Sequence, residues 1–370
     1  MANLSVKHRA KLLEDVYGHD KVIHELVKRQ KENNFPKVIY MTGAPGIGKT
    51  TLMKIIAKSI LCGNKDVEGN PCNKCKVCSG IDQELPSNYY FEKNASNLKI
   101  EDMREIDTSS KKKPLGEVSH KVFVIDELQE LARNPAAQKN ILKTLENPSG
   151  TSYFILGSMD DSKVNAAIKR RAVTYKLKDI EAGEIANYLM SICIAEKIEI
   201  DEKKENILFK IAEGSNGSPG IAVPLLERVI YSELWDLTLD ELTEELDIVD
   251  NDLVTNLLAG LINGDVEVFT KTYTDKVLDT LRFQLNLIFK AKNDILLSSW
   301  QKQQIDKTGF SKVGVETIKR VIDELNKLYL YPFVTPTMIE SSLISIFSIF
   351  KLEVAQPIVE TKPLPRRKPL

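Results

Sequence analysis

The feature that most constrains this chain is the octapeptide GAPGIGKT at residues 43–50, which directly follows an apolar run at residues 38–41. It fits the pattern G-x-x-x-x-G-K-[ST], in which glycines let the backbone wrap around phosphate oxygens with its N–H groups pointing inward. The motif requires a strand before it and a helix after it, and residues 52–61 have the apolar spacing of a helix. The sequence therefore predicts an α/β fold with a phosphate-binding loop.

Residue types assign roles within this loop. Gly43, Gly46 and Gly48 are expected to contact the nucleotide through the backbone. We expect Lys49 to neutralise the β- and γ-phosphates, and the Thr50 hydroxyl to ligate Mg²⁺. Thr51, the next residue, is also expected to contact the nucleotide.

Short apolar runs alternate with helical patterns between residues 35 and 171, as in a parallel sheet covered by helices. Nearly continuous β-branched and aromatic runs suit strands that are buried on both faces. The predicted strands are residues 38–41, 89–91, 122–125, 153–156 and 173–175.

Asp126 and Glu127 end the apolar run at residues 122–125. The carboxyl ends of parallel strands share one sheet edge, so both acids should lie beside the phosphate loop. We expect Asp126 to hold Mg²⁺ and Glu127 to orient and activate an attacking water. With Lys49, these residues predict an ATPase site.

Four of the five cysteines lie at positions 62, 72, 75 and 78, a C-x₉-C-x₂-C-x₂-C pattern. Clustered thiols without an export signal favour metal binding over disulfides. Cys62, Cys72, Cys75 and Cys78 are therefore predicted to form a structural zinc site, because four thiolates leave no open coordination position. Cys193 stands on an apolar helical face and is expected to be a core thiol.

The bulk composition sets limits on partners. The formal net charge of -1 over 370 residues excludes a uniformly basic nucleic-acid binder, so DNA contacts must come from local or shared patches. No signal peptide and no apolar run of about 18 residues is found, which predicts a cytoplasmic protein without membrane association.

Helical spacing dominates after residue 180, with a Gly/Ser/Pro breaker at residues 214–220. An acidic segment at residues 236–252 precedes further amphipathic helices. The predicted domains are residues 1–176 (nucleotide binding, with a zinc module at 62–78), 177–245 (helical lid), 246–355 (helical collar and oligomerisation) and 356–370 (flexible tail rich in proline and basic residues).

The order of phosphate loop, cysteine cluster and Asp-Glu strand resembles the ATPase (gamma/tau) subunits of the bacterial DNA polymerase III clamp loader. A zinc module directly after the first helix is unusual among AAA+ proteins, which makes the match selective. Four other stretches are similar to the family: KHR at 7–9, LEDVYGH up to His19, IEDMR at 100–104 and NILKTLENP at 140–148. The resemblance covers residues 7–180 and extends to about 230.

This resemblance implies an AAA+ P-loop core with a parallel sheet, a small helical lid and a C-terminal all-α collar through which subunits form a ring. It places adenine near Val16 and Tyr17, and the implied cofactors are ATP, Mg²⁺ and Zn²⁺. The family's arginine finger maps onto Arg171, with Arg170 as a substitute because the neighbouring Ser and Cys of the motif are replaced. Such a guanidinium would stabilise charge on the γ-phosphate of a neighbouring subunit.

Two sensor positions depart from the family pattern. Met159 stands where a polar residue is expected, with Ser158 or Asp160 as possible replacements. The segment GSPGI at residues 217–221 looks like the non-hydrolysing delta-prime subunit, and Ile221 stands where an arginine is expected. Slow or partner-dependent hydrolysis is one consequence.

The implied partners are other clamp-loader subunits, a sliding clamp and primed-template DNA. The family-like basic residues Arg104 and Lys143 are predicted to contact the DNA backbone. The run Lys111, Lys112 and Lys113 is either a further DNA contact or a solvated loop. The clamp-facing edge would include residues 79–86, and the tail either binds a polymerase or helicase or is simply disordered.

Three functions remain open at this point. The first is a motor subunit that loads a clamp onto primed DNA as it hydrolyses ATP. The second is a stator-like subunit of the delta-prime type, favoured by Met159 and Ile221 but opposed by the complete phosphate loop. The third is another AAA+ machine, such as a helicase loader or branch-migration motor, which the cysteine cluster argues against.

Overall fold

The computed structural model describes residues 3–114, 116, 118–146, 148–246, 248, 251–263, 265, 281–282, 285, 288–289, 313–328 and 335–354. The chain separates into two compact units, Met1–Leu242 and Thr243–Leu370. The boundary falls within the acidic segment 236–252. The predicted tail at residues 356–370 lies outside the described residues.

The first unit contains a five-stranded parallel sheet in the order β2-β3-β4-β1-β5. Its strands are β1 Val38–Thr42, β2 Tyr90–Asn94, β3 Lys121–Asp126, β4 Ser152–Ser158 and β5 Val173–Lys176. The three central strands are buried along almost their whole length, because helices cover both faces. All five predicted strands are therefore confirmed.

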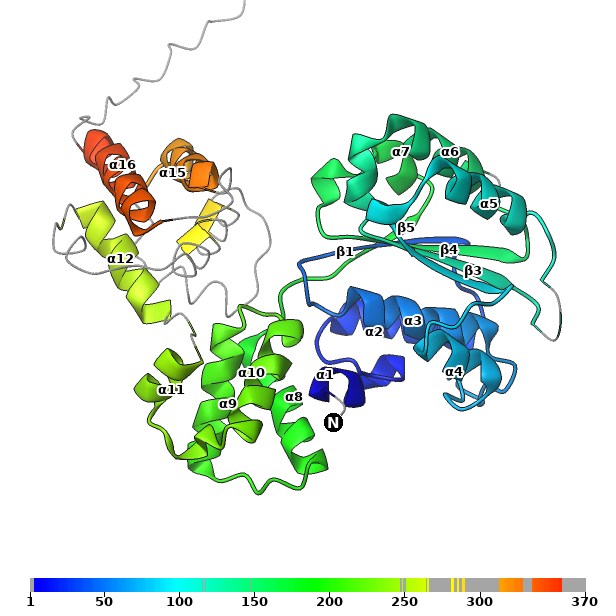
Figure 1. Cartoon of the computed structure of the whole chain (residues 1–370), viewed down its shortest axis with the longest axis horizontal. Helices are drawn as coiled ribbons and strands as arrows, with labels where there is room; N and C mark the ends of the chain where they lie inside the picture. The colour runs from blue at the N-terminus through cyan, green and yellow to red at the C-terminus, as the bar shows by residue number, and fades with distance from the viewer. Residues whose placement is uncertain are drawn as a thin grey trace, which may run out of the picture. The chain divides into compact units, whose positions relative to one another are not determined.

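Figure 1 shows two helical layers on opposite sides of this sheet. One layer contains α2 Asp20–Lys31, α3 Lys49–Leu61 and α4 Lys76–Asp82. The other contains α5 Ile100–Ser110, α6 Pro135–Glu146 and α7 Ala166–Lys169. Short 3₁₀ turns occur at η1 Leu13–Asp15, η2 Ala95–Asn97, η3 Leu128–Arg133 and η4 Asp161–Lys163.

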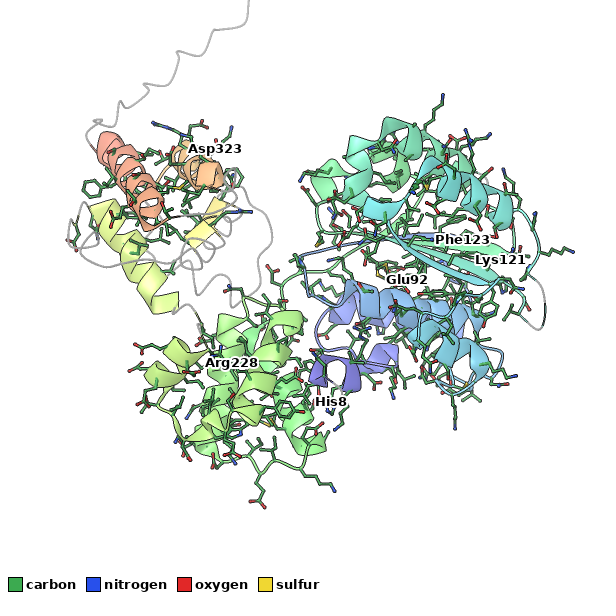
Figure 2. All side chains as sticks on the ribbon, in the orientation of Figure 1. His8, Glu92, Lys121, Phe123, Arg228 and Asp323 are labelled. Carbon is green, nitrogen blue, oxygen red and sulfur yellow. The ribbon has the colours of Figure 1, made fainter. Side chains whose placement is uncertain are left out.

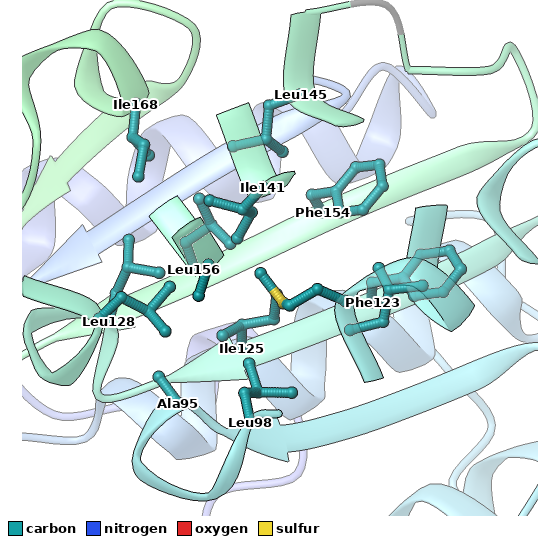
Figure 3. Close-up of a cluster of buried hydrophobic side chains, with 14 of the residues drawn as sticks. Ala95, Leu98, Phe123, Ile125, Leu128, Ile141, Leu145, Phe154, Leu156 and Ile168 are labelled. Carbon is teal, nitrogen blue, oxygen red and sulfur yellow. The ribbon is translucent and has the colours of Figure 1, made fainter. Parts of the chain in front are cut away.

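The core beneath the second layer is formed by side chains of β3 and β4 and of the helices above them (Figure 3). Phe123 stacks between two other rings, with centroids 4.8 Å from Phe91 and 5.1 Å from Phe154. Ile141 and Leu145 of α6 pack onto the same face of the sheet. These contacts fix α5 and α6 across the strands whose carboxyl ends form the site.

A helical lid follows β5 and consists of α8 Ala182–Ala195, α9 Glu202–Gly214 and α10 Pro219–Tyr231. The predicted breaker at residues 214–220 separates α9 from α10, with residues 215–218 between the two helices and Pro219 and Gly220 in the first turn of α10. The short α1 Leu4–Lys7 packs against α10, where Leu4 N–H donates to Glu227 Oε1 at 3.2 Å. Turn η5 Leu234–Asp236 and helix α11 Leu239–Glu245 follow α10.

The second unit is helical wherever it is described as regular structure, with α12 Asn251–Asn263, α15 Val315–Leu328 and α16 Pro336–Val354. Their buried faces form one apolar cluster, in which Leu257, Val321 and Leu343 are almost fully buried. The parallel α/β core, helical lid and helical C-terminal part are thus confirmed. The finer domain limits and the oligomerisation role of the collar remain predictions.

Candidate nucleotide-binding site

A cavity of about 260 Å³ lies where the phosphate loop, the N-terminal segment and the lid meet. The predicted residues Val16, Tyr17, Gly46, Gly48, Lys49, Thr50 and Thr51 all line it. The other lining residues come from the N-terminal segment, the phosphate loop and the lid: Ser5, Arg9, Ala10, Asp15, Ile47, Ile180, Tyr188, Pro219, Gly220 and Val223. Gly43 does not line the cavity; a Cβ there would lie 2.8 Å from Leu177 O.

The carbonyl oxygens of residues 43–47 all point at hydrogen-bond donors. Two are bonded by the loop's own lysine, two by the lid and one by a histidine of the core. The bonds are Lys49 Nζ to Gly43 O and Ala44 O at 2.8 Å each, Ser218 Oγ to Pro45 O at 3.2 Å, Gly220 N–H to Gly46 O at 2.9 Å, and His19 Nε2 to Ile47 O at 3.1 Å. Carbonyls held in this way leave the loop N–H groups available for an anion.

The expected magnesium ligands lie next to each other. Thr50 Oγ1 donates to Asp126 Oδ2 at 2.9 Å, and the Glu127 N–H donates to Asp126 Oδ1 at 2.8 Å. Hard oxygen ligands of this kind suit Mg²⁺, which keeps several waters when bound to protein and phosphate. Gly157 on the adjacent β4 leaves space for the carboxylate, since a Cβ there would lie 3.1 Å from Asp126 Cγ.

Lys49 lies largely buried at the start of α3, whereas the predicted helix began at residue 52. Burial lowers the pKa of the Lys49 ammonium, and the charges of Asp126 and Glu127 oppose this shift. The backbone of Glu127 is left-handed, with φ 55°, which turns the chain out of β3 at this residue.

The part of the cavity away from the phosphate loop has an aromatic wall. The rings of Tyr17 and Tyr188 lie 5.0 Å apart between centroids, and Tyr188 comes from lid helix α8. The Tyr188 hydroxyl donates to His8 O at 3.1 Å, which ties the lid to the N-terminal segment. This wall, together with Val16, Ile180 and Val223, suits the flat apolar face of a nucleotide base.

The structure corrects the expectation for the lid sensor. Ile221 is 48% exposed and does not line the cavity, whereas its neighbour Gly220 lies against the phosphate loop. The first turn of α10 therefore presents residue 220, not residue 221, to the site. A shift of one residue along a helix changes the direction of the side chain by about 100°. The sequence alone did not show which of the two residues faces the site.

At the first sensor position, Met159 is 39% exposed. The buried hydroxyl of Ser158 lies 2.8 Å from Gln129 Oε1 and accepts from the Asp160 N–H at 3.2 Å. The Ser158 side chain is thus bonded within the protein. Asp160 caps the following turn by accepting from the Ser162 N–H at 2.9 Å.

The predicted arginine finger lies on the surface after α7. Arg171 pairs with Glu146 at 2.7 Å and donates to Ala167 O at 2.8 Å. Neither Arg171 nor the exposed Arg170 lines the cavity of its own chain. If Arg171 or Arg170 acts as an arginine finger, it must therefore act in the nucleotide site of a second subunit.

The cysteine cluster is assembled as predicted. The sulfurs of Cys62, Cys72, Cys75 and Cys78 all lie within 4.8 Å of one another, with Cys62 Sγ 3.6 Å from Cys72 Sγ and 4.0 Å from Cys75 Sγ. A tetrahedron with Zn–S bonds of about 2.3 Å requires sulfurs about 3.8 Å apart. The Lys74 backbone N–H lowers the pKa of Cys72 to about 6, which favours the thiolate there, whereas burial raises the pKa of Cys62 and of Cys78.

The cluster is joined to the helix that follows the phosphate loop. Cys62 is the C-cap of α3, and the same helix carries two buried lysines, Lys54 and Lys58. Lys58 donates to Asn73 Oδ1 at 2.7 Å and pairs with Asp82 at 3.0 Å. Lys54 pairs with Glu84 at 2.5 Å and lies 3.5 Å from Glu92, which is labelled in Figure 2.

The predicted DNA-contacting residues lie on the opposite layer of the sheet. Arg104 on α5 and Lys143 on α6 are exposed, and the two helices contact each other. Lys111 pairs with Asp107 at 2.6 Å, while Lys112 and Lys113 follow as exposed residues at the end of α5. Both helices thus carry exposed basic residues, and contact of these residues with DNA remains a prediction.

Several site residues were missed by sequence reasoning. His19, Ser218, Gly220 and Tyr188 act through hydrogen bonds to the backbone or through long-range packing, and none of them was assigned a role in the site from the sequence. Burial lowers the pKa of His19, so a neutral ring with its proton on Nε2 can donate to Ile47 O. His19 lay in a stretch already noted as family-like, and Ser218 and Gly220 lay in the delta-prime-like segment at residues 217–221.

The cysteine cluster gives a direct prediction. We expect purified protein to contain roughly one zinc per chain, because four thiolates form a closed structural site. Cys75→Ser should lose most of this zinc and melt at a lower temperature, as measured by elemental analysis and calorimetry. Cys193→Ser is the matched control, since this buried lid thiol lies outside the cluster. Full zinc occupancy in Cys75→Ser would contradict the assignment.

Comparison with known proteins identifies similar sequences and structures. A family model described as DNA polymerase III, delta subunit, matches residues 18–181, which include the phosphate loop, the cysteines and Arg171. Among solved structures, RuvB from Thermotoga maritima, titled a Holliday junction branch migration motor, matches with a TM-score of 0.48 and 17% identity over 82% of this chain and 91% of that chain. At that level of similarity, nothing about this chain follows from it.

Curated relatives give the family likeness. DNA polymerase III subunit tau/gamma of Haemophilus influenzae is 28% identical over 73% of this chain and 38% of its own length. Subunit gamma of Buchnera aphidicola (subsp. Acyrthosiphon pisum) is 30% identical over 66% of both chains, and subunit tau of Bacillus subtilis is 31% identical over 60% of this chain and 38% of its own. The chain thus spans between about two fifths and two thirds of these relatives. This chain, with its phosphate loop and parallel α/β core, resembles in sequence the gamma/tau subunits of bacterial DNA polymerase III.

Proposed function

We propose that the chain is a clamp-loader subunit that binds ATP between its core and lid and hydrolyses it while a sliding clamp is placed on primed DNA. The observation that carries the proposal is the phosphate loop, whose carbonyls are hydrogen-bonded within the protein and whose Thr50 Oγ1 lies 2.9 Å from Asp126 Oδ2. The names of the relatives, DNA polymerase III subunits gamma and tau, supply the replication context.

The proposed mechanism follows from the chain's own residues. On ATP binding, Lys49 would exchange the Gly43 and Ala44 carbonyls for phosphate oxygens, and the loop N–H groups would hold the phosphates. Mg²⁺, held by Thr50 and by Asp126, would neutralise charge on the phosphates. Glu127 would orient a water and accept its proton as the water oxygen bonds to the γ-phosphorus; the bond between the γ-phosphorus and the bridging oxygen breaks, and ADP and phosphate are the products.

Other parts of the proposal extend beyond one chain. Arg171 would leave Glu146 and enter a neighbouring subunit's site, and the exposed Arg104, Lys143 and Lys111–Lys113 would follow the DNA backbone without reading sequence. The helical second unit would join subunits into a ring. Among the helices that the structure describes, none is long and apolar enough to span a membrane.

A stator-like role is the second candidate, and one observation favours it. The lid residue that faces the phosphate loop is Gly220, which has no cationic side chain to place near a γ-phosphate. Such a subunit would bind ATP tightly and turn it over slowly. The two candidates therefore differ in hydrolysis and share nucleotide binding.

Two substitutions separate binding from hydrolysis. Lys49→Ala should lose ATP affinity, because the loop's own cation is removed. Glu127→Gln should keep ATP affinity and lose about 100-fold or more in steady-state hydrolysis, since only the water-activating carboxylate is changed. Affinity is measured by calorimetry and turnover by phosphate release, with and without primed DNA and clamp.

Lys178→Ala, at an exposed residue outside the cavity, is the control for lost charge. Tight ATP binding with no turnover in the unchanged chain, even with DNA and clamp, would support the stator. An unchanged affinity in Lys49→Ala would contradict nucleotide binding at this loop.

Mixing two inactive variants tests Arg171. Arg171→Ala should lower hydrolysis by about 1,000-fold if it completes a neighbour's site. A mixture of Arg171→Ala with Lys49→Ala should regain part of the activity, because the second variant supplies an intact Arg171 to the intact loop of the first. Arg170→Ala is the neighbouring control. A mixture as inactive as its components would count against a shared site.

A further inference from the structure

The first turn of lid helix α10 is in direct contact with the phosphate loop. The Gly220 N–H donates to Gly46 O at 2.9 Å, and Ser218 Oγ donates to Pro45 O at 3.2 Å. Ser218 is the N-cap of α10, but its side chain makes no capping hydrogen bond to its own helix. The hydroxyl that would ordinarily cap the helix is bonded to the phosphate loop instead.

This contact leaves no room for a side chain at residue 220. A Cβ on Gly220 would lie 2.7 Å from Gly46 Cα, 2.9 Å from Gly46 O and 3.2 Å from Gly46 C. All three neighbours are backbone atoms, so no flexible side chain can move away. Gly46 itself has φ 70°, a left-handed conformation that residues with a side chain rarely adopt, so glycine is favoured on this side of the contact as well. Lid and loop therefore fit only as glycine against glycine.

The same lid forms the base side of the cavity. Tyr188 of α8 and Val223 of α10 line it together with Gly220, and α8 and α10 contact each other. A displacement of the first turn of α10 would move Val223 directly and Tyr188 through the lid packing. The contact of Gly220 with the phosphate loop therefore determines where Tyr188 and Val223 lie in the part of the cavity proposed to hold the base.

We propose that Gly220 is a positioning residue for the nucleotide: because it lacks a side chain, the lid seats on the phosphate loop and places Tyr188 and Val223 against the base. The inference rests on the proposed function, since it takes the ligand of this cavity to be ATP. In this proposal, the lid contacts the phosphate loop through the backbone of Gly220 and not through a charged side chain.

The lid supplies its own matched control. Gly183 occupies the second position of α8, as Gly220 does in α10, and a Cβ on Gly183 would have nothing within 4 Å. Replacing glycine by alanine in a helix usually stabilises it when space is available. The intrinsic effect on helix formation is therefore the same in the two variants, and they differ in the contact with residue 46.

The experiment measures the affinity for ATPγS with Mg²⁺ by calorimetry in the full chain. Gly220→Ala should bind about tenfold or more weakly, as expected for overpacking against fixed backbone, and Gly183→Ala should stay within about twofold of the unchanged chain. Ser218→Ala, which adds no atoms, should lose affinity by a smaller factor. Equal affinity in Gly220→Ala and Gly183→Ala would overturn the inference.

A second readout separates positioning from general damage. If Gly220→Ala acts by moving the lid, Tyr188→Ala should cost much less affinity in the Gly220→Ala background than in the unchanged chain. Full additivity of the two losses would contradict a shared cause. Without nucleotide, hydrogen exchange at the Gly220 N–H should be slow in the unchanged chain and in Gly183→Ala; fast exchange there would overturn the contact itself.

Failure of the proposed function gives a different result. If the unchanged chain did not bind ATPγS, the proposed function would be wrong, and the role of Gly220 in nucleotide binding would fall with it. If the unchanged chain bound ATPγS and Gly220→Ala bound it equally well, only the inference about Gly220 would be wrong.

Discussion

The nucleotide site of the first unit depends on one constraint: the carbonyl oxygens of the phosphate loop must find hydrogen-bond donors within the protein. Carbonyls that turned inward would repel a phosphate, and buried carbonyls without donors would cost free energy. Here Lys49, the lid and His19 bond the carbonyls of residues 43–47. The lid and His19 therefore help to fix the conformation of the loop, while Lys49, which lines the cavity, is the donor that phosphate oxygens would take over.

Helix α3 connects this loop to the cysteine cluster, since it begins at Lys49 and is capped by Cys62. Its buried Lys54 and Lys58 pair with acceptors that lie within or just after the zinc module. Because a buried charge is tolerated only with partners, these lysines fix the module to the helix. A structural zinc would thus stabilise the helix whose first turn carries Thr50. In this way the zinc module would help to position a residue of the nucleotide site.

Local patterns predicted much of the fold and of the site. The strands, the Asp126–Thr50 pairing and the four-cysteine cluster follow from motifs in which a few neighbouring residues carry the chemistry. Contacts made by the backbone did not show in the sequence: Gly220 reads as part of a loop, and its partner Gly46 is distant along the chain. The expectation for Ile221 was wrong for the same reason, since helix register near Pro219 depends on how the lid seats on the loop.

The central claim is that ATP binds between the phosphate loop and the lid. It is tested most directly by an experimental structure of the full chain with a non-hydrolysable ATP analogue and Mg²⁺. We predict that the phosphates lie within residues 43–50, that Mg²⁺ lies beside Thr50 and Asp126, and that the base lies beside Tyr17 and Tyr188. An analogue bound elsewhere, or a loop left empty at saturating analogue, would contradict the account.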